Sequence, residues 1–301
     1  MKKILFIYYS QSGQLAEIAR SIAKPFLADE AVEIDFYEIK MVHHFPFPWT
    51  SDAFFNTFPE TFQQIPEEIH PPAPKILETA YDLILLHYQV WYLSPSIPVN
   101  SFLKSTYARQ ILAGKPVITV SGSRNMWAKA QDKVKALLLE NQATLVGNIA
   151  LTDRHHNLIS VVTIVDWMFS GKKRKAYGIF PKPGVSDKEI QEADKFGKII
   201  LPYLKNANFE GLQQALIAQG AVDYRFFLVS MDQKGNRMFR IWSSIILKNP
   251  KRRQQLVRMF KYYVVFAIYV VSPIVYLIEL LLYPLLYFLK YRREKAHYEG
   301  I

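Results

Sequence analysis

The chain has 301 residues and a formal net charge of +11, yet it contains no cysteine. The lack of thiols excludes disulfides, thiolate zinc sites and a cysteine nucleophile. The charge distribution argues against nucleic acid as a partner, because residues 206–301 hold 14 lysines and arginines against 6 acids, and these basic residues flank a long apolar run instead of lining a folded face.

Strand and helix patterns alternate over residues 1–205. Short apolar runs predict five strands, at residues 4–9, 32–39, 81–88, 115–122 and 145–151. Ser186, with Glu189 three residues later, predicts the start of a helix that ends near Leu204. The alternation predicts a doubly wound α/β fold with a five-stranded parallel sheet, whose ligands bind beyond the carboxyl ends of the strands.

The loop after the first predicted strand reads SQSGQL, from Ser10 to Leu15. The hydroxyls of Ser10 and Ser12, the glycine at position 13 and the free amides of the following helix would form an anion cradle without a lysine. This suits a monoester phosphate. Small polar turns between a strand and a helix are also common without a ligand. Whether this turn binds phosphate or is only structural therefore depends on the loops that follow the later strands.

Residues 43–74 form an insertion that is rich in proline and aromatic side chains. It holds seven of the 17 prolines and seven aromatic residues, which are Phe45, Phe47, Trp49, Phe54, Phe55, Phe58 and Phe62. So apolar a segment suggests either a lid that covers the bound ligand or a channel for an acyl chain. The alternative is a loop that packs on the sheet edge. His43 and His44 open the insertion and are weaker catalytic candidates.

Two further loops follow the third and fourth predicted strands. The first reads QVWYLSPSIPVNSFL, from Gln89 to Leu103, and begins with adjacent aromatic residues. The second reads SGSRNMW, from Ser121 to Trp127. Both loops lie at the edge of the sheet where we expect a ligand.

With these loops in order, residues 1–204 resemble the flavodoxin-like FMN proteins, including the quinone reductase and modulator-of-drug-activity type. The resemblance implies a flavodoxin-like sheet and FMN as cofactor. It assigns the flavin phosphate to Ser10, Ser12, Gly13, Gln14 and Leu15, and the flavin ring to Gln89, Val90, Trp91, Tyr92, Ser121, Gly122, Ser123, Arg124 and Asn125. Leu15 departs from the family pattern, which has a hydroxyl there. Trp91 and Tyr92 look like the pair that stacks on the isoalloxazine.

The turn after the fifth predicted strand supplies the candidates for acid–base chemistry. His155 and His156 lie there beside Asp153 and Arg154, and an imidazole is a suitable base for a carbon acid. Arg124 would hydrogen-bond the flavin or stabilise an enolate oxygen. The alternative is that all three side chains are solvated bystanders. We expect no metal, because the two histidine pairs are adjacent residues and lack zinc-site spacing.

The sequence divides the chain into four regions. Residues 1–205 form the expected FMN-binding domain, 206–261 a basic connector, 262–289 a membrane anchor and 290–301 a basic tail. Within the connector, Lys234-Gly235-Asn236 predicts the turn of a hairpin, and the alternative is two short helices.

The most apolar stretch runs from Tyr262 to Leu289. Within its 28 residues the exceptions are Ser272, Pro273, Glu279 and Pro284. About 20 apolar residues cross a bilayer, and the flanking basic residues suit anionic headgroups. The prolines and the symmetric charges leave three alternatives open: a single span, an anchor lying in one leaflet, and a docking helix. Because no signal peptide precedes the first strand, we expect attachment at the cytoplasmic face of a bacterial inner membrane.

The third loop, the Arg154-His155-His156 turn and the tail also resemble the flavodoxin-like proteins of bacterial dialkylresorcinol and flexirubin pathways. Those proteins are often labelled condensing enzymes, but a decarboxylating condensation uses a cysteine that is absent here. The resemblance instead implies oxidation of a cyclohexanedione with two alkyl chains, made by a partner ketosynthase and acyl carrier protein. The alternatives are a membrane NAD(P)H:quinone reductase and a flavin-free subunit that anchors a ketosynthase. Quinone reductases of this fold commonly pair, so a homodimer is a further expectation.

Overall fold

The computed structural model describes the backbone of all 301 residues and every side chain except those of Leu286, Phe288 and Leu289. The five parallel strands are β1 (Lys2–Tyr8), β2 (Val32–Glu38), β3 (Leu83–Trp91), β5 (Pro116–Ser123) and β6 (Thr144–Thr152). The two-residue β4 (Ser94–Pro95) pairs antiparallel with β3. The order β2-β1-β3-β5-β6 is that of the flavodoxin-like fold, so the predicted fold class is confirmed.

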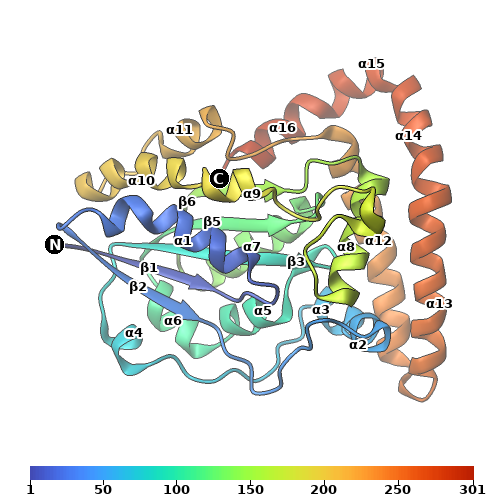
Figure 1. The fold of residues 1–301 in the computed structure, drawn as a ribbon, viewed down its shortest axis with the longest axis horizontal. Helices are drawn as coiled ribbons and strands as arrows, with labels where there is room; N and C mark the ends of the chain where they lie inside the picture. The colour runs from blue at the N-terminus through green and yellow to red at the C-terminus, as the bar shows by residue number, and fades with distance from the viewer.

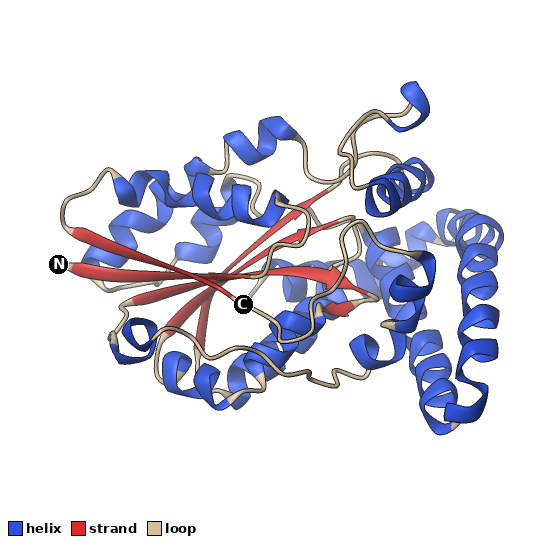
Figure 2. Ribbon diagram, turned by 60° about the horizontal axis from the view of Figure 1, so that its bottom comes forward, coloured by secondary structure: helices blue, strands red, loops and turns tan.

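Helices cover both faces of the sheet (Figure 1). One face carries α1 (Gln14–Leu27), α9 (Asp187–Gln191), α10 (Asp194–Asn206) and α11 (Leu212–Ala218). The other face carries α4 (Pro74–Glu78), α5 (Ile97–Leu103), α6 (Thr106–Leu112) and α7 (Ala128–Glu140). Because both faces are covered, the central strands are continuous apolar runs, as Ile4 to Ile7 illustrate. Figure 2 shows the twisted strands between these layers.

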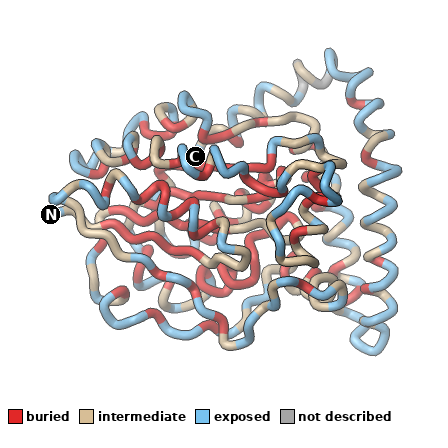
Figure 3. Tube along the Cα trace, in the orientation of Figure 1, coloured by how far each residue is buried: buried red, intermediate tan, exposed pale blue. Residues whose placement is uncertain are grey.

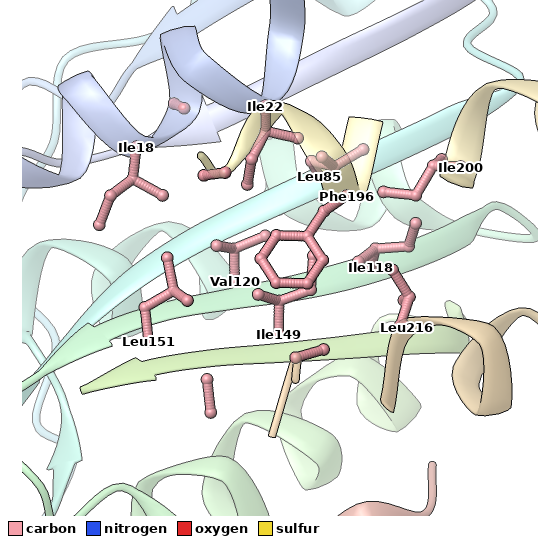
Figure 4. Packing of buried hydrophobic residues seen from close by; sticks show 14 of the residues in the cluster. Ile18, Ile22, Leu85, Ile118, Val120, Ile149, Leu151, Phe196, Ile200 and Leu216 are labelled. Atoms are coloured by element: carbon pink, nitrogen blue, oxygen red, sulfur yellow. The ribbon is translucent and has the colours of Figure 1, made fainter. Parts of the chain in front are cut away.

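The core extends beyond residue 205, where the sequence analysis ended the first domain. Ala150 on the edge strand β6 donates its amide hydrogen to the carbonyl of Ala221 at 2.7 Å, and Gln213 accepts from the amide of Asn148 at 2.7 Å. Leu216 of α11 is fully buried in the cluster that also holds Ile149 of β6 and Phe196 of α10 (Figure 4). The segment that follows α10 therefore packs against the edge strand β6 and belongs to the core of the sheet domain.

The predicted helix at 186–204 is interrupted. The side chain of Ser186 accepts a hydrogen bond from the amide of Glu189 at 3.2 Å, which confirms the expected cap. However, the helix ends at Gln191 as α9 and resumes as α10 at Asp194.

The 43–74 insertion forms the short helices α2 (Ser51–Asn56) and α3 (Phe58–Phe62). Phe58 and Phe62 are buried against helices from the C-terminal third, in a cluster with Ile246, Val257 and Phe260. The insertion thus joins the sheet domain to the C-terminal helices.

The C-terminal third is a row of helices. They are α12 (Phe226–Lys248), α13 (Arg253–Phe266), a π-helical segment (Ala267–Val271), α14 (Ser272–Leu281), α15 (Tyr283–Leu286), a second π-helical segment (Tyr287–Tyr291) and α16 (Arg292–Glu299). Neither the hairpin predicted at Lys234-Gly235-Asn236 nor the alternative of two short helices is present. The single 23-residue helix α12 runs through these positions instead. Asp232 and Asn236 are buried there, so packing against the domain overrides the local turn signal.

The helices from Pro250 to Leu281 form one continuous rod of 32 residues, long and apolar enough to cross a membrane by length and composition. The rod stands antiparallel to α12, next to the carboxyl ends of the strands (Figure 1). The carboxyl edge of the sheet, where ligands are expected, therefore lies close to the most apolar part of the chain.

Candidate functional site

The first predicted loop lies at the start of α1. Gly13 precedes the helix with φ of 89°, and a Cβ placed on it would meet no atom within 4 Å. The amides of the first helical turn have no partner inside the helix. Ser10 orders the turn, because its hydroxyl accepts from the amide of Ala16 at 3.1 Å. The loop thus presents an open helix N-terminus that suits an anion.

Gln14 and Leu15 do not point to this opening. The carboxamide of Gln14 makes two hydrogen bonds of 3.2 Å with the backbone of Val185, and so ties the loop to residues 181–185. Leu15 is a core residue, 4% exposed, and its Cδ1 would lie 3.1 Å from a Cβ on Gly122. The missing hydroxyl at position 15 is therefore explained by packing, and only the backbone of Leu15 remains for a ligand.

A cavity of about 440 Å³ opens beside this loop. Its lining includes Ser10 and Gln11 on one side and His44, Phe45 and Phe47 of the insertion on the other. The insertion therefore walls the space next to the expected phosphate site, as a lid would.

The second loop separates the two aromatic residues expected to stack on a flavin. Trp91 is half-buried and makes edge contacts with Trp49 at 5.3 Å and Phe45 at 5.1 Å between ring centroids. Tyr92 has φ of 48° and donates its hydroxyl to the carbonyl of Phe54 at 2.8 Å. Its ring also packs on Phe58, at 5.1 Å. Tyr92 therefore belongs to the aromatic cluster of the insertion.

Polar atoms without partners lie at the ends of β3 and β5. Among the side chains that the structure describes, the buried Nε2 of Gln89, Oγ of Ser123 and Oδ1 of Asn125 make no hydrogen bond. Leaving such a group unpaired costs about 1–3 kcal/mol. Val90 is partly buried against both core clusters. The backbones of Ser121 and Gly122 pair with β3, while Oγ of Ser121 is a further buried atom without a partner among the described residues. These orphaned atoms fit a ligand that carries both donors and acceptors.

Arg124 is held in place by α8 (Asn157–Ser170), the helix that follows β6. Its Nη1 donates to Oδ1 of Asn157 at 2.8 Å, and Asn125 donates to the same oxygen at 2.9 Å. Burial lowers the pKa of Arg124 to about 10, while Asp153 opposes this shift. The guanidinium is therefore protonated at neutral pH.

His155 forms a pair with Asp153. Its Nδ1 lies 2.7 Å from Oδ1 of this fully buried carboxylate, which also accepts from the amide of His155 at 3.0 Å. The second oxygen, Oδ2, accepts from the hydroxyl of Ser160 at 2.8 Å and from the amide of Gly184 at 3.3 Å. A carboxylate on Nδ1 places the proton there and leaves Nε2 as the basic atom.

The structure distinguishes the two histidines of this turn. His156 is exposed, and its ring makes no hydrogen bond to any residue that the structure describes. Asp153, by contrast, joins the turn to the third loop, since its amide donates to the carbonyl of Arg124 at 2.7 Å. In the sequence, Asp153 is identified only as a neighbour of the two histidines, although its two-residue spacing from His155 was an available signal; Asn157 and Ser160 are not identified at all.

No metal site accompanies these residues: the described side chains include no group of three or more His, Cys, Asp or Glu that would hold a metal ion.

The comparisons with known proteins concern solved structures. No family model and no curated protein matches the chain. A flavoprotein from Lactobacillus acidophilus in complex with FMN is 20% identical over 50% of this chain and 93% of its own, with a TM-score of 0.39. Oxidised flavodoxin 1 from Bacillus cereus is 18% identical over 67% of this chain and 99% of its own, with a TM-score of 0.37. A putative flavoprotein from Bacteroides eggerthii is 18% identical over 52% and 91%, with a TM-score of 0.40. These similarities are too low to assign a function, which rests on the site's own residues.

Proposed function

We propose that this chain binds FMN across the three loops and is an oxidoreductase. The proposal rests on one observation. An open helix N-terminus at Gly13 and the orphaned polar atoms of Gln89, Ser123 and Asn125 lie at the same edge of the sheet. A helix N-terminus suits the FMN phosphate. The orphaned donor and acceptors suit the polar edge of the flavin ring.

Trp91 would then contact the flavin ring, and His155, Asp153 and Arg124 would transfer and stabilise the substrate's proton and charge. FMN, when bound, supplies the hydride acceptor. His155 removes a proton from the substrate through Nε2, and Asp153 keeps the imidazole oriented. Arg124 stabilises negative charge on a carbonyl oxygen of the substrate as that proton leaves.

We propose as substrate a cyclohexanedione that carries two alkyl chains. Loss of a hydride to the flavin and of a proton to His155 removes two hydrogens from the ring, and tautomerisation gives a dialkylresorcinol. The aromatic insertion and the apolar rod support a lipid-like substrate, since Phe260 of the rod packs on Phe58 of the insertion beside the carboxyl edge of the sheet. A ketosynthase with an acyl carrier protein would supply the dione, and attachment to the cytoplasmic face of the membrane would bring the enzyme to it.

One observation favours the flavin-free anchoring subunit as second candidate. The carboxamide of Gln14 is bound by Val185, and Tyr92 is packed on Phe54 and Phe58, so two of the residues expected at the flavin are occupied by the protein itself. The two candidates differ in whether the protein binds FMN.

Calorimetry on the full-length protein in mild detergent tests this. We expect FMN to bind, and Gly13→Asp to weaken binding at least about tenfold, because the carboxylate would repel the phosphate. Gly114→Asp is the matched control: it too has positive φ and open space around its Cβ, but it lies before β5 at the opposite edge of the sheet. Well-folded wild-type protein that binds no FMN would overturn the proposal in favour of the anchoring subunit.

A further inference from the structure

The geometry points to attachment within a single leaflet: the rod from Pro250 to Leu281 lies in the plane of the membrane surface, and the chain does not cross the bilayer. The partner is a lipid surface with anionic headgroups. The inference rests on the proposed membrane attachment and specifies its form.

The first end of the rod is fixed to the sheet domain. Arg253 makes two parallel hydrogen bonds to the carboxylate of Glu60 in the insertion, at 2.7 and 2.8 Å. Two helical turns further on, the ring of Phe260 stacks on Phe58 with 3.6 Å between centroids. These contacts hold the beginning of the rod on the surface of the folded domain.

The other end returns to the same domain through α16. Tyr298 is 3% exposed; its ring packs edge-on against Trp127, and its hydroxyl donates to Asp132 at 3.2 Å. The carbonyl of Glu299 accepts from Gln213 of α11 at 2.8 Å. Both ends of the rod, and the C-terminus with them, are therefore on the side of the membrane where the domain lies.

The rod's own acid turns away from lipid. Glu279 is the one charged residue between Lys261 and Lys290 in the sequence. Its carboxylate is buried against α12, where Ser230 and Lys234 contact it. A carboxylate in the middle of the apolar stretch is thus neutralised within the protein, and the outer face of the rod is free of charge between those two lysines.

Much of the rod is exposed (Figure 3), and its exposed side chains are largely apolar. A stripe at helical spacing consists of Tyr262, Phe266, Val270, Ile274, Leu277 and Leu281. The neighbouring α12 also exposes Met238, Ile241 and Ile245. So large an apolar surface on a folded chain marks an interaction site.

Exposed basic residues at both ends of the rod fit anionic headgroups. They are Lys248, Lys251, Arg252 and Arg258 at one end and Lys290, Arg292 and Arg293 at the other. Each lysine or arginine near such a surface contributes about 1 kcal/mol of attraction. An apolar stripe with basic residues at both ends is the pattern of a helix that lies in the interface.

The contacts on both sides of the rod argue against a simple crossing. The length of the rod would allow one, since a helix of 32 residues is about 48 Å long and the hydrocarbon core is about 30 Å thick. Crossing would carry Leu281 to the far side of the bilayer, yet Arg253 at the start of the rod is bound to Glu60, and Tyr298 of α16, beyond its end, is bound to Asp132 of the same domain. The chain after Leu281 would have to return across the bilayer, or the contact between Tyr298 and Asp132 would have to break.

Spin labels on single cysteines test the inference, and because the chain has no cysteine each introduced thiol is unique. The labelled full-length variants are Phe266→Cys, Ile274→Cys and Leu281→Cys, bound to phosphatidylcholine vesicles that contain phosphatidylglycerol. Leu139→Cys, at a 77% exposed position near the far end of α7, is the control in water. We expect the three rod labels at one shallow depth of about 5–10 Å, and the control label in water.

The other outcomes are distinguishable. A central label much deeper than the two outer ones would mean a span, which would overturn the in-plane geometry and leave the membrane attachment intact. Water access to all three labels, unchanged by vesicles, would overturn the attachment as well. A second measurement uses Lys251→Cys and Arg293→Cys with a membrane-impermeant maleimide added outside sealed vesicles: in-plane binding leaves both thiols reactive, whereas a span protects one.

Discussion

Nδ1 of His155 lies 2.7 Å from the buried carboxylate of Asp153, whereas the neighbouring His156 is exposed. This relationship separates two histidines that the sequence could not distinguish. A buried carboxylate fixes both the tautomer and the direction of the imidazole, so it prepares Nε2 as a base.

The first prediction follows from that pair. With a dialkyl cyclohexanedione and FMN-loaded protein under anaerobic conditions, we expect resorcinol to form and the flavin to bleach without NAD(P)H. His155→Ala should slow bleaching by about 100-fold or more, and His156→Ala should leave it nearly unchanged. Equal rates in both variants would remove the base assignment. Rapid bleaching by NADPH with no response to the dione would replace the proposed activity by that of a quinone reductase.

The second prediction concerns the crossing of α1 and α10. A Cβ on Gly197 would lie 2.1 Å from the carbonyl oxygen of Ile22, a backbone atom that cannot move aside. We therefore expect Gly197→Ala to destabilise the protein by about 3 kcal/mol or more, or to prevent folding. Gly235→Ala in α12 is the control, because the new Cβ would meet only the end of the Leu93 side chain at 3.0 Å. Thermal unfolding of the two variants should separate them clearly; similar melting temperatures would contradict the close crossing.

The third prediction tests whether α11 belongs to the sheet domain. Leu216 is fully buried against β6, and Leu→Ala changes in cores cost about 2–5 kcal/mol. We expect Leu216→Ala to fall in this range and the exposed Gln214→Ala to stay within about 0.5 kcal/mol of wild type. For the same reason, a chain that ends at Lys205 should not give a folded domain. A soluble, cooperatively unfolding fragment of residues 1–205 would show that the domain ends where the sequence analysis placed its boundary.

The fold follows from local patterns for most of its length. Continuous apolar runs such as Ile4 to Ile7 can be satisfied only in strands buried on both faces, so the parallel sheet was predictable. The turn signal at Lys234-Gly235-Asn236 failed because it is local, while the burial of Asp232 and Asn236 depends on α7, about a hundred residues earlier in the chain.

The candidate site was predictable only in its position. Three loops at one sheet edge follow from the order of the strands, but the direction of each side chain depends on distant partners. Leu15 is turned into the core beneath Gly122, and Tyr92 is drawn towards Phe54 of the insertion. Neither contact has a signature in the sequence near these residues.

The last prediction concerns pH and the buried Asp232, which joins α12 to α7 by accepting from the amide of Lys129 at 3.1 Å. Burial raises the pKa of Asp232 to about 7, although the hydrogen bond from Lys129 opposes the shift and the nearby Asp132 adds to it. A carboxyl whose pKa is raised by folding favours the folded state at low pH. The stability that this carboxyl contributes to the folded protein is fully present below its unfolded-state pKa, near 4, and is lost as the pH rises towards 7.

Asp232→Asn should remove this dependence, because the amide oxygen still accepts from Lys129 but carries no charge. We expect the variant to be more stable than wild type at pH 8 by about 1 kcal/mol or more, and the difference to shrink or reverse at pH 5. Urea unfolding of both proteins at the two pH values measures it. Glu140→Gln, at an exposed position at the end of α7, is the control and should show a much smaller change with pH. If Asp232→Asn instead loses stability equally at both pH values, the carboxylate is charged in the folded state and the assigned direction of its pKa shift is incorrect.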